Sequence, residues 1–88
     1  MDFARDAVFG PDGNLYVGSR GSDEVLRYNG TTGEFIDRFV TSGSGGLDEP
    51  IGLVFGADGN LYVSSGGDTD RVLRYDGTSG AFIDEFVT

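Results

Sequence analysis

Carboxylates gathered in two short loops are the groups of this chain whose arrangement comes closest to a metal-binding pattern. They belong to Asp23 and Glu24 in the first half and to Asp68 and Asp70 in the second. Carboxylate oxygens are hard ligands of the kind that Ca²⁺ takes in proteins. Neither loop has the spacing of a calcium-loop motif, and acidic loop residues are usually only solvated. We therefore expect no bound cofactor, and a Ca²⁺ site at these four residues is the alternative.

The sequence offers no other set of side chains for catalysis. It contains no histidine and no cysteine, so a histidine base, a thiolate nucleophile and nitrogen or sulfur ligands for a metal are all missing. It also lacks a nucleophile elbow and a P-loop. Asp12 and Asp58 each lie in a Gly-x-Asp-Gly-Asn segment, where aspartate commonly bonds its own backbone. We expect no catalytic residue and predict that the chain is not an enzyme.

The charge of the chain argues against two classes of partner. Its 88 residues include 6 arginines and 15 acidic residues, which gives a net charge of -9. Such a charge repels the phosphates of nucleic acid and of anionic membranes. No apolar run approaches the length of a membrane span, and the first residues lack the basic and apolar regions of a signal peptide. We expect a soluble chain that binds neither nucleic acid nor membrane, and the sequence leaves its compartment open.

The chain is a tandem repeat of one unit. Residues 8–21 recur at 54–67 with 11 of 14 positions identical, and residues 23–41 recur at 70–88 with 14 of 19 identical. The first pairing is shifted by 46 positions and the second by 47. A repeat of this kind normally cannot bury its apolar faces alone and stacks on its neighbours.

Each unit is predicted to form four antiparallel strands, which makes the chain all-β. Short runs rich in Val, Leu, Ile, Phe and Tyr alternate with glycine-rich turns, and the apolar spacing of a helix is absent. The turns around Pro11-Asp12-Gly13 and Asn29-Gly30 predict hairpins within the first unit. The expected strands are Ala4–Phe9, Asn14–Ser19, Glu24–Tyr28 and Glu34–Val40, then Ile51–Phe55, Asn60–Ser65, Arg71–Tyr75 and Ala81–Val87.

The middle strands indicate that a sheet has neighbours on both sides. Leu15, Tyr16 and Val17 are consecutive apolar residues, and the second unit repeats them. A strand with one face in water would alternate apolar and polar residues instead. The small, polar and glycine-rich stretch from Thr41 to Pro50 predicts a surface crossover between the two sheets.

The units resemble blades of a β-propeller, most closely those of NHL-type repeats and of lactonase-like propellers. The resemblance rests on Pro50-Ile51-Gly52-Leu53-Val54-Phe55, on Asp58-Gly59-Asn60-Leu61-Tyr62-Val63, and on Arg71-Val72-Leu73-Arg74-Tyr75-Asp76. It implies two four-stranded blades, 1–41 and 51–88, joined by a crossover over 42–50. The near-identity of the units is typical of a fragment, a consensus sequence or a designed protein.

The resemblance also implies that the fold is incomplete, because such propellers close with at least four blades. Copies of the chain are then expected to complete the ring, as a homotetramer with eight blades or, as the second choice, a homotrimer with six. Arg5 and Asp6 would fall on the innermost strand and line the central channel. The expected function is structural self-assembly, and a ligand- or protein-binding propeller is the alternative. A Ca²⁺-dependent lactonase-like hydrolase is a second alternative, although the innermost segments lack the Glu and Asn ligands of that family.

Overall fold

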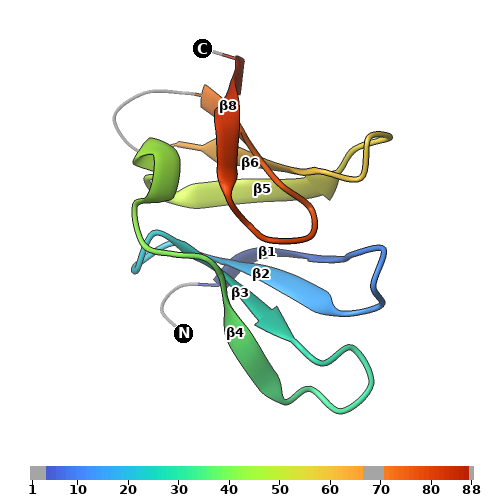
Figure 1. Cartoon of the computed structure of the whole chain (residues 1–88). Helices are drawn as coiled ribbons and strands as arrows, with labels where there is room; N and C mark the ends of the chain where they lie inside the picture. The colour runs from blue at the N-terminus through green and yellow to red at the C-terminus, as the bar shows by residue number, and fades with distance from the viewer. Residues whose placement is uncertain (1–3, 67–70, 88) are drawn as a thin grey trace.

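The computed structural model consists of two four-stranded antiparallel sheets joined by one linking segment (Figure 1). It describes residues 4–66 and 71–87, with the side chains of residues 4–6 left aside. The first sheet has the order β1-β2-β3-β4 and the second the order β5-β6-β7-β8. The strands are β1 (Ala4–Phe9), β2 (Leu15–Ser19), β3 (Glu24–Tyr28), β4 (Phe35–Val40), β5 (Pro50–Phe55), β6 (Leu61–Ser65), β7 (Arg71–Tyr75) and β8 (Phe82–Val87). The predicted all-β fold with two antiparallel meanders is therefore confirmed.

The first hairpin of each sheet is closed by the turn that the sequence predicts. The N–H of Gly10 donates to the carbonyl oxygen of Asn14 at 2.9 Å, and Gly13 between them has φ +82°. The second sheet repeats this turn, with Gly59 at φ +81°. Glycine is favoured at this position because a Cβ disfavours the left-handed region.

The second hairpin of each sheet is longer than the two-residue turn that an Asn-Gly pair usually signals. The N–H of Asn29 donates to the carbonyl oxygen of Glu34 at 2.7 Å, and the left-handed glycine is Gly33, with φ +79°, rather than Gly30. The Asn29 side chain instead accepts the N–H groups of Thr31 and Thr32. The hairpin was predicted correctly, and its turn type was not.

Gly30 is required by a close approach of the two hairpins. A Cβ at this position would overlap the carbonyl oxygen of Gly13, and Gly77 stands against Gly59 in the same way. We predict that Gly30→Ala lowers the free energy of unfolding by about 1–3 kcal/mol, because the two backbones must separate. Thr31→Ala, at an exposed neighbouring position, is the control. Urea unfolding of the two variants compares them, and equal stabilities would contradict this packing.

The two sheets pack face to face, with β1 and β2 lying against β5. In Figure 1, β1 and β5 run beside each other while β4 and β8 lie at opposite ends of the layered pair. Between the sheets lies one apolar cluster of buried residues. It contains Tyr16, Val25, Phe39 and Val40 from the first sheet, Leu53, Leu61, Val63, Leu73 and Tyr75 from the second, and Leu47 from the link.

The linking segment is less superficial than its composition suggests. It contains a short 3-10 helix, η1 (Ser44–Gly46), which packs against β8. After it, Leu47 is only 2% exposed and Pro50 is buried. The hydroxyl of Tyr75 donates to the carbonyl oxygen of Ser44 at 2.6 Å and ties the link to the second sheet. The predicted surface crossover thus includes residues that complete the core.

Candidate assembly faces

Alternation along the strands gives each sheet one face that meets the other sheet and one that does not. On the inner face of the first sheet, the Tyr16 ring contacts Phe39 edge-on with ring centroids 4.9 Å apart. The same ring meets Phe55 of the second sheet, also at 4.9 Å. Tyr16 is fully buried in this position. Aromatic pairs of this geometry contribute beyond their buried area, so the Tyr16–Phe55 contact is a central part of the packing between sheets.

The outer face of the second sheet carries counterparts of the residues on the inner face of the first, but here the large apolar side chains are much more exposed. Phe86 is 56% exposed, whereas its counterpart Phe39 is 6% exposed. Val87 is 50% exposed, whereas Val40 is fully buried. We call this surface the Phe86 face, and it consists of Val54, Tyr62, Val72, Arg74, Phe86 and Val87.

The outer face of the first sheet corresponds to the inner face of the second. Phe9 is 63% exposed there, and its counterpart Phe55 is the ring that meets Tyr16 across the sheets. Phe35 is also exposed, and it packs edge-on against Tyr28 at 5.6 Å. We call this surface the Phe9 face, and it consists of Phe9, Leu15, Val17, Leu26, Tyr28 and Phe35.

The two outer faces are therefore sequence counterparts of two surfaces that already fit each other. The inner contact joins the face containing Tyr16 and Phe39 to the face containing Phe55, and the outer faces carry Tyr62 and Phe86 on one side and Phe9 on the other. The side chains within the faces are also arranged alike, since Tyr62 and Phe86 contact edge-on at 5.0 Å as Tyr16 and Phe39 do at 4.9 Å. The clearest departure is Ala7, which stands where the second sheet has Leu53.

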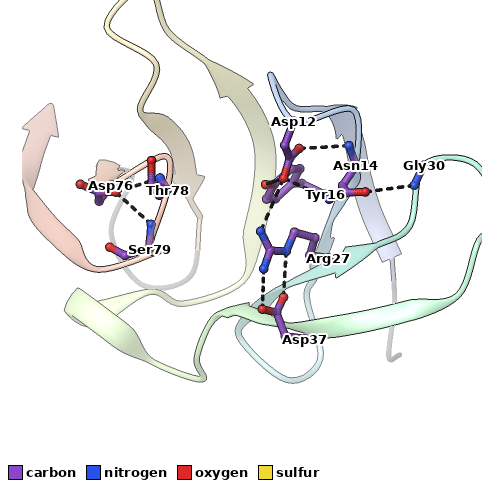
Figure 2. Close-up of polar contacts among 9 residues, drawn as sticks. All are labelled: Asp12, Asn14, Tyr16, Arg27, Gly30, Asp37, Asp76, Thr78 and Ser79. Carbon is purple, nitrogen blue, oxygen red and sulfur yellow. Dashed lines mark hydrogen bonds and ion pairs between the residues drawn. The ribbon is translucent and has the colours of Figure 1, made fainter.

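A network of hydrogen bonds and ion pairs orders the Tyr16 side of the first sheet, and its counterpart orders the Phe86 face of the second. In Figure 2, Asp12 accepts hydrogen bonds from the backbone N–H of Asn14 at 3.0 Å and from the hydroxyl of Tyr16 at 2.7 Å. Arg27 makes two bonds to Asp37 on the next strand, at 3.0 and 2.7 Å, and lies 3.5 Å from Asp12 of the first hairpin. Bidentate pairs of this kind are the geometrically specific ones. The expected turn role of Asp12 is confirmed.

The second sheet repeats the network with nearly the same distances. The Tyr62 hydroxyl donates to Asp58 at 2.7 Å, and Arg74 bonds Asp84 at 3.0 and 2.6 Å. The tyrosine of this network was not identified from the sequence. The signal that could have found it is the Asp-Gly-Asn-Leu-Tyr run, which occurs in both units.

Hydrogen bonds to carboxylates lower several pKa values. Hydrogen bonds from Tyr62 and from the backbone of Asn60 lower the pKa of Asp58 below its ordinary value of 3.8. For Asp12, burial acts to raise the pKa, but the bonds from Asn14 and Tyr16 outweigh it and the pKa is lowered. Asp76 accepts the N–H groups of Ser79 and Thr78, which lower its pKa (Figure 2).

Asn29 of the first unit corresponds to Asp76 of the second, and this difference predicts how the stability of the chain depends on pH. A carboxylate whose pKa is lower in the folded chain contributes stability that is complete above the unfolded value of 3.8 and is lost as the pH falls through the folded value. Asn29 makes the same two bonds without titrating. Acidification from about pH 6 to pH 3 should therefore lower the unfolding free energy less for Asp76→Asn than for the parent, and more for Asn29→Asp. Urea unfolding at both pH values measures this, and an identical loss in all three proteins would contradict it.

The two described carboxylates of the proposed Ca²⁺ site, those of Asp23 and Glu24, are bound to other groups of the protein. Asp23 accepts the backbone N–H of Glu49 at 2.8 Å and so anchors the link. Glu24 accepts the Ser22 hydroxyl at 2.7 Å and pairs with Arg38 at 2.6 Å. Both carboxylates thus hold groups of the protein itself. Among residues 4–66 and 71–87, no three His, Cys, Asp or Glu side chains gather as metal ligands.

The remaining predicted site residues are only partly placed. Asp68 and Asp70 lie outside the described residues. Arg5 and Asp6 lie in β1 between its pairings Ala4–Ser19 and Ala7–Val17, where the register shifts. Their backbone is at the sheet edge that adjoins β5, and a channel-lining role for them stays a prediction.

Comparisons with protein-family models, with curated proteins and with solved structures give no match for this chain. Within the described part of the chain, the structure contains no helix with the length and apolar character needed to span a bilayer.

Proposed function

We propose that the chain is a structural building block that associates head to tail with copies of itself and closes into a ring of sheets, an NHL-like β-propeller. The observation that carries the proposal is the equivalence of the outer faces to the inner ones. The first sheet has a surface built like the Phe55 side of the internal contact, on which Phe9 and Phe35 are more than half exposed while Val17 and Leu26 are 6% exposed. The second sheet has one built like the Tyr16 side.

The driving force proposed for association is burial of apolar area. Phe9, Phe35, Val54, Phe86 and Val87 are large apolar side chains that are at least half exposed in one chain. Burial of apolar surface contributes about 25 cal/mol per Å² removed from water. Extended apolar surfaces of this kind mark interaction sites on monomers.

Head-to-tail contacts produce a ring when the rotation closes and a filament when it does not. Because each chain supplies two sheets, the total is even, and bulky aromatic layers between sheets favour the larger ring. We propose a homotetramer with eight sheets, and a homotrimer with six as the second choice. The proposed activity requires no cofactor and no catalytic residue. The net charge of -9 supports leaving nucleic acid and anionic membranes out of the partners.

Light scattering after size exclusion, followed by native mass spectrometry, tests the proposal. At micromolar concentration we expect a mass four times, or as second choice three times, that of the 9.3 kDa chain. A single-chain mass together with a native β-sheet circular dichroism spectrum would refute it.

A further inference from the structure

A cavity of about 390 Å³ opens at one end of the second sheet. Ile51, Ser64, Val72 and Val87 are among its lining residues, from four different strands. The wall is mostly apolar, and Val87, from the Phe86 face, is half exposed. The cavity is therefore an indentation in one of the two assembly faces.

The corresponding place on the first sheet is filled by the linking segment. Gly18, the counterpart of Ser64, lies against Pro50, whose Cβ would be 3.5 Å from a Cβ built on the glycine. Val25 and Val40, the counterparts of Val72 and Val87, are fully buried and belong to the same cluster as Leu47. Residues 47–50 thus cover a place on the first sheet whose counterpart on the second sheet is a cavity in the described part of the chain.

The repeat assigns a counterpart to that cover. With the shift of 46 positions, Leu47 corresponds to Met1 and Pro50 to Ala4. The backbone of Ala4 pairs with Ser19 as Pro50 pairs with Ser65, so the two segments enter their sheets in the same register.

The sizes of the residues also compensate. Within the chain a residue without a side chain, Gly18, faces the ring of Pro50, whereas the proposed contact between copies would set Ser64 against the smaller Ala4. Replacement of Leu47 by Met1 keeps an apolar side chain of similar volume, which is the kind of exchange that packed sites tolerate best.

We propose that this cavity receives residues 1–4 of a second copy of the chain, with Met1 in the place that Leu47 takes within the chain. The inference rests on the head-to-tail association proposed above and adds to it a specific contact. Packing between copies then includes insertion of a segment, and does not depend on the flat sheet faces alone.

Disulfide cross-linking tests the contact cleanly because the chain has no cysteine. We expect Ala4→Cys combined with Ser64→Cys to link copies, which appear as dimers and larger species on a non-reducing gel. Gly18→Cys with Pro50→Cys is the matched control and should link within one chain, since a Cβ separation of 3.5 Å suits a disulfide. Ala4→Cys with Thr78→Cys, at an exposed hairpin position, should give no links between copies above the level of either single cysteine.

The outcomes separate the two proposals. If light scattering finds the assembled mass but Ala4→Cys/Ser64→Cys gives no links beyond the Thr78 control, the insertion is refuted and the association stands. If the parent chain does not associate, both proposals fail. Should the cysteine pair itself prevent association, Ser64→Leu is the second test. We expect it to fill the cavity and weaken association at least tenfold relative to Thr78→Leu, and an unchanged affinity would refute the insertion.

Discussion

Replacing Phe86 by glutamate is expected to convert the assembled protein to single folded chains. Phe86 is 56% exposed and contacts Tyr62 and Arg74 of its own sheet. A carboxylate at this position costs the isolated chain little, because it stays in water beside Arg74. In the assembly the same carboxylate would leave water and lie against the apolar Phe9 face, and this desolvation is costly even beside Arg74. Light scattering gives the mass, and circular dichroism shows whether the sheets are retained.

Phe39, the counterpart of Phe86 in the first unit, provides a matched control. Phe39→Glu introduces the same change at a position that is 6% exposed and should unfold the chain rather than merely separate copies. A Phe86→Glu protein that keeps the parent's mass would show that the Phe86 face takes no part in association.

The second large effect is expected for the same pair of residues replaced by alanine. Phe39→Ala removes a ring from between the sheets, where it contacts Tyr16 at 4.9 Å, and should lower the free energy of unfolding by about 3–5 kcal/mol. That is a large fraction of the stability of a small domain. Phe86→Ala should lower it by about 1 kcal/mol or less, because an exposed ring has little buried area to lose.

Urea unfolding, at a concentration below that at which the parent associates, measures both values. The comparison is direct because the two phenylalanines occupy equivalent positions in two nearly identical sheets. Equal losses for the two variants would mean that the sheets are not asymmetrically covered, and would contradict the packing described above.

The repeat made most of the fold predictable. All eight expected strands end at the observed last residue and begin within one residue of the observed first residue, because turn residues such as Gly13 and Gly59 mark the strand ends in both units. The pairing of Arg27 with Asp37 was also accessible, since both residues lie on strands joined by a short hairpin. The hydrophobic pattern and the turn residues are local properties of the sequence, and they were sufficient to predict the strands and their pairing.

Properties that depend on the two sheets together were not accessible. Phe39 and Phe86 occupy equivalent positions of the repeat, yet one is buried and the other exposed, because burial depends on which face of each sheet has a neighbour. The turn at Asn29 differed from its usual signal because Gly30 is constrained by the backbone of Gly13 in the other hairpin. Leu47 was treated as part of a polar surface link, since its burial depends on the space left between two sheets.

The polar networks explain how a face can stay ordered while uncovered. Asp58, Tyr62 and Arg74 make bonds within their own sheet, with the same partners as in the covered sheet. Phe86 stays edge-on to Tyr62, as Phe39 does to Tyr16. A surface that is ordered before it binds loses less conformational entropy on association, which favours assembly of such faces.

The central claim is that the Phe9 face of one copy fits the Phe86 face of another, and mixing two blocked variants tests it most directly. Phe9→Glu blocks one face and Phe86→Glu the other, so each variant alone should have the mass of a single chain in light scattering. Mixed in equal amounts at high concentration, they retain one intact pair of faces and should form a dimer of one chain of each kind, without larger rings. A Phe9→Glu protein that still associates with itself, or a mixture that stays at the mass of one chain, would contradict the account.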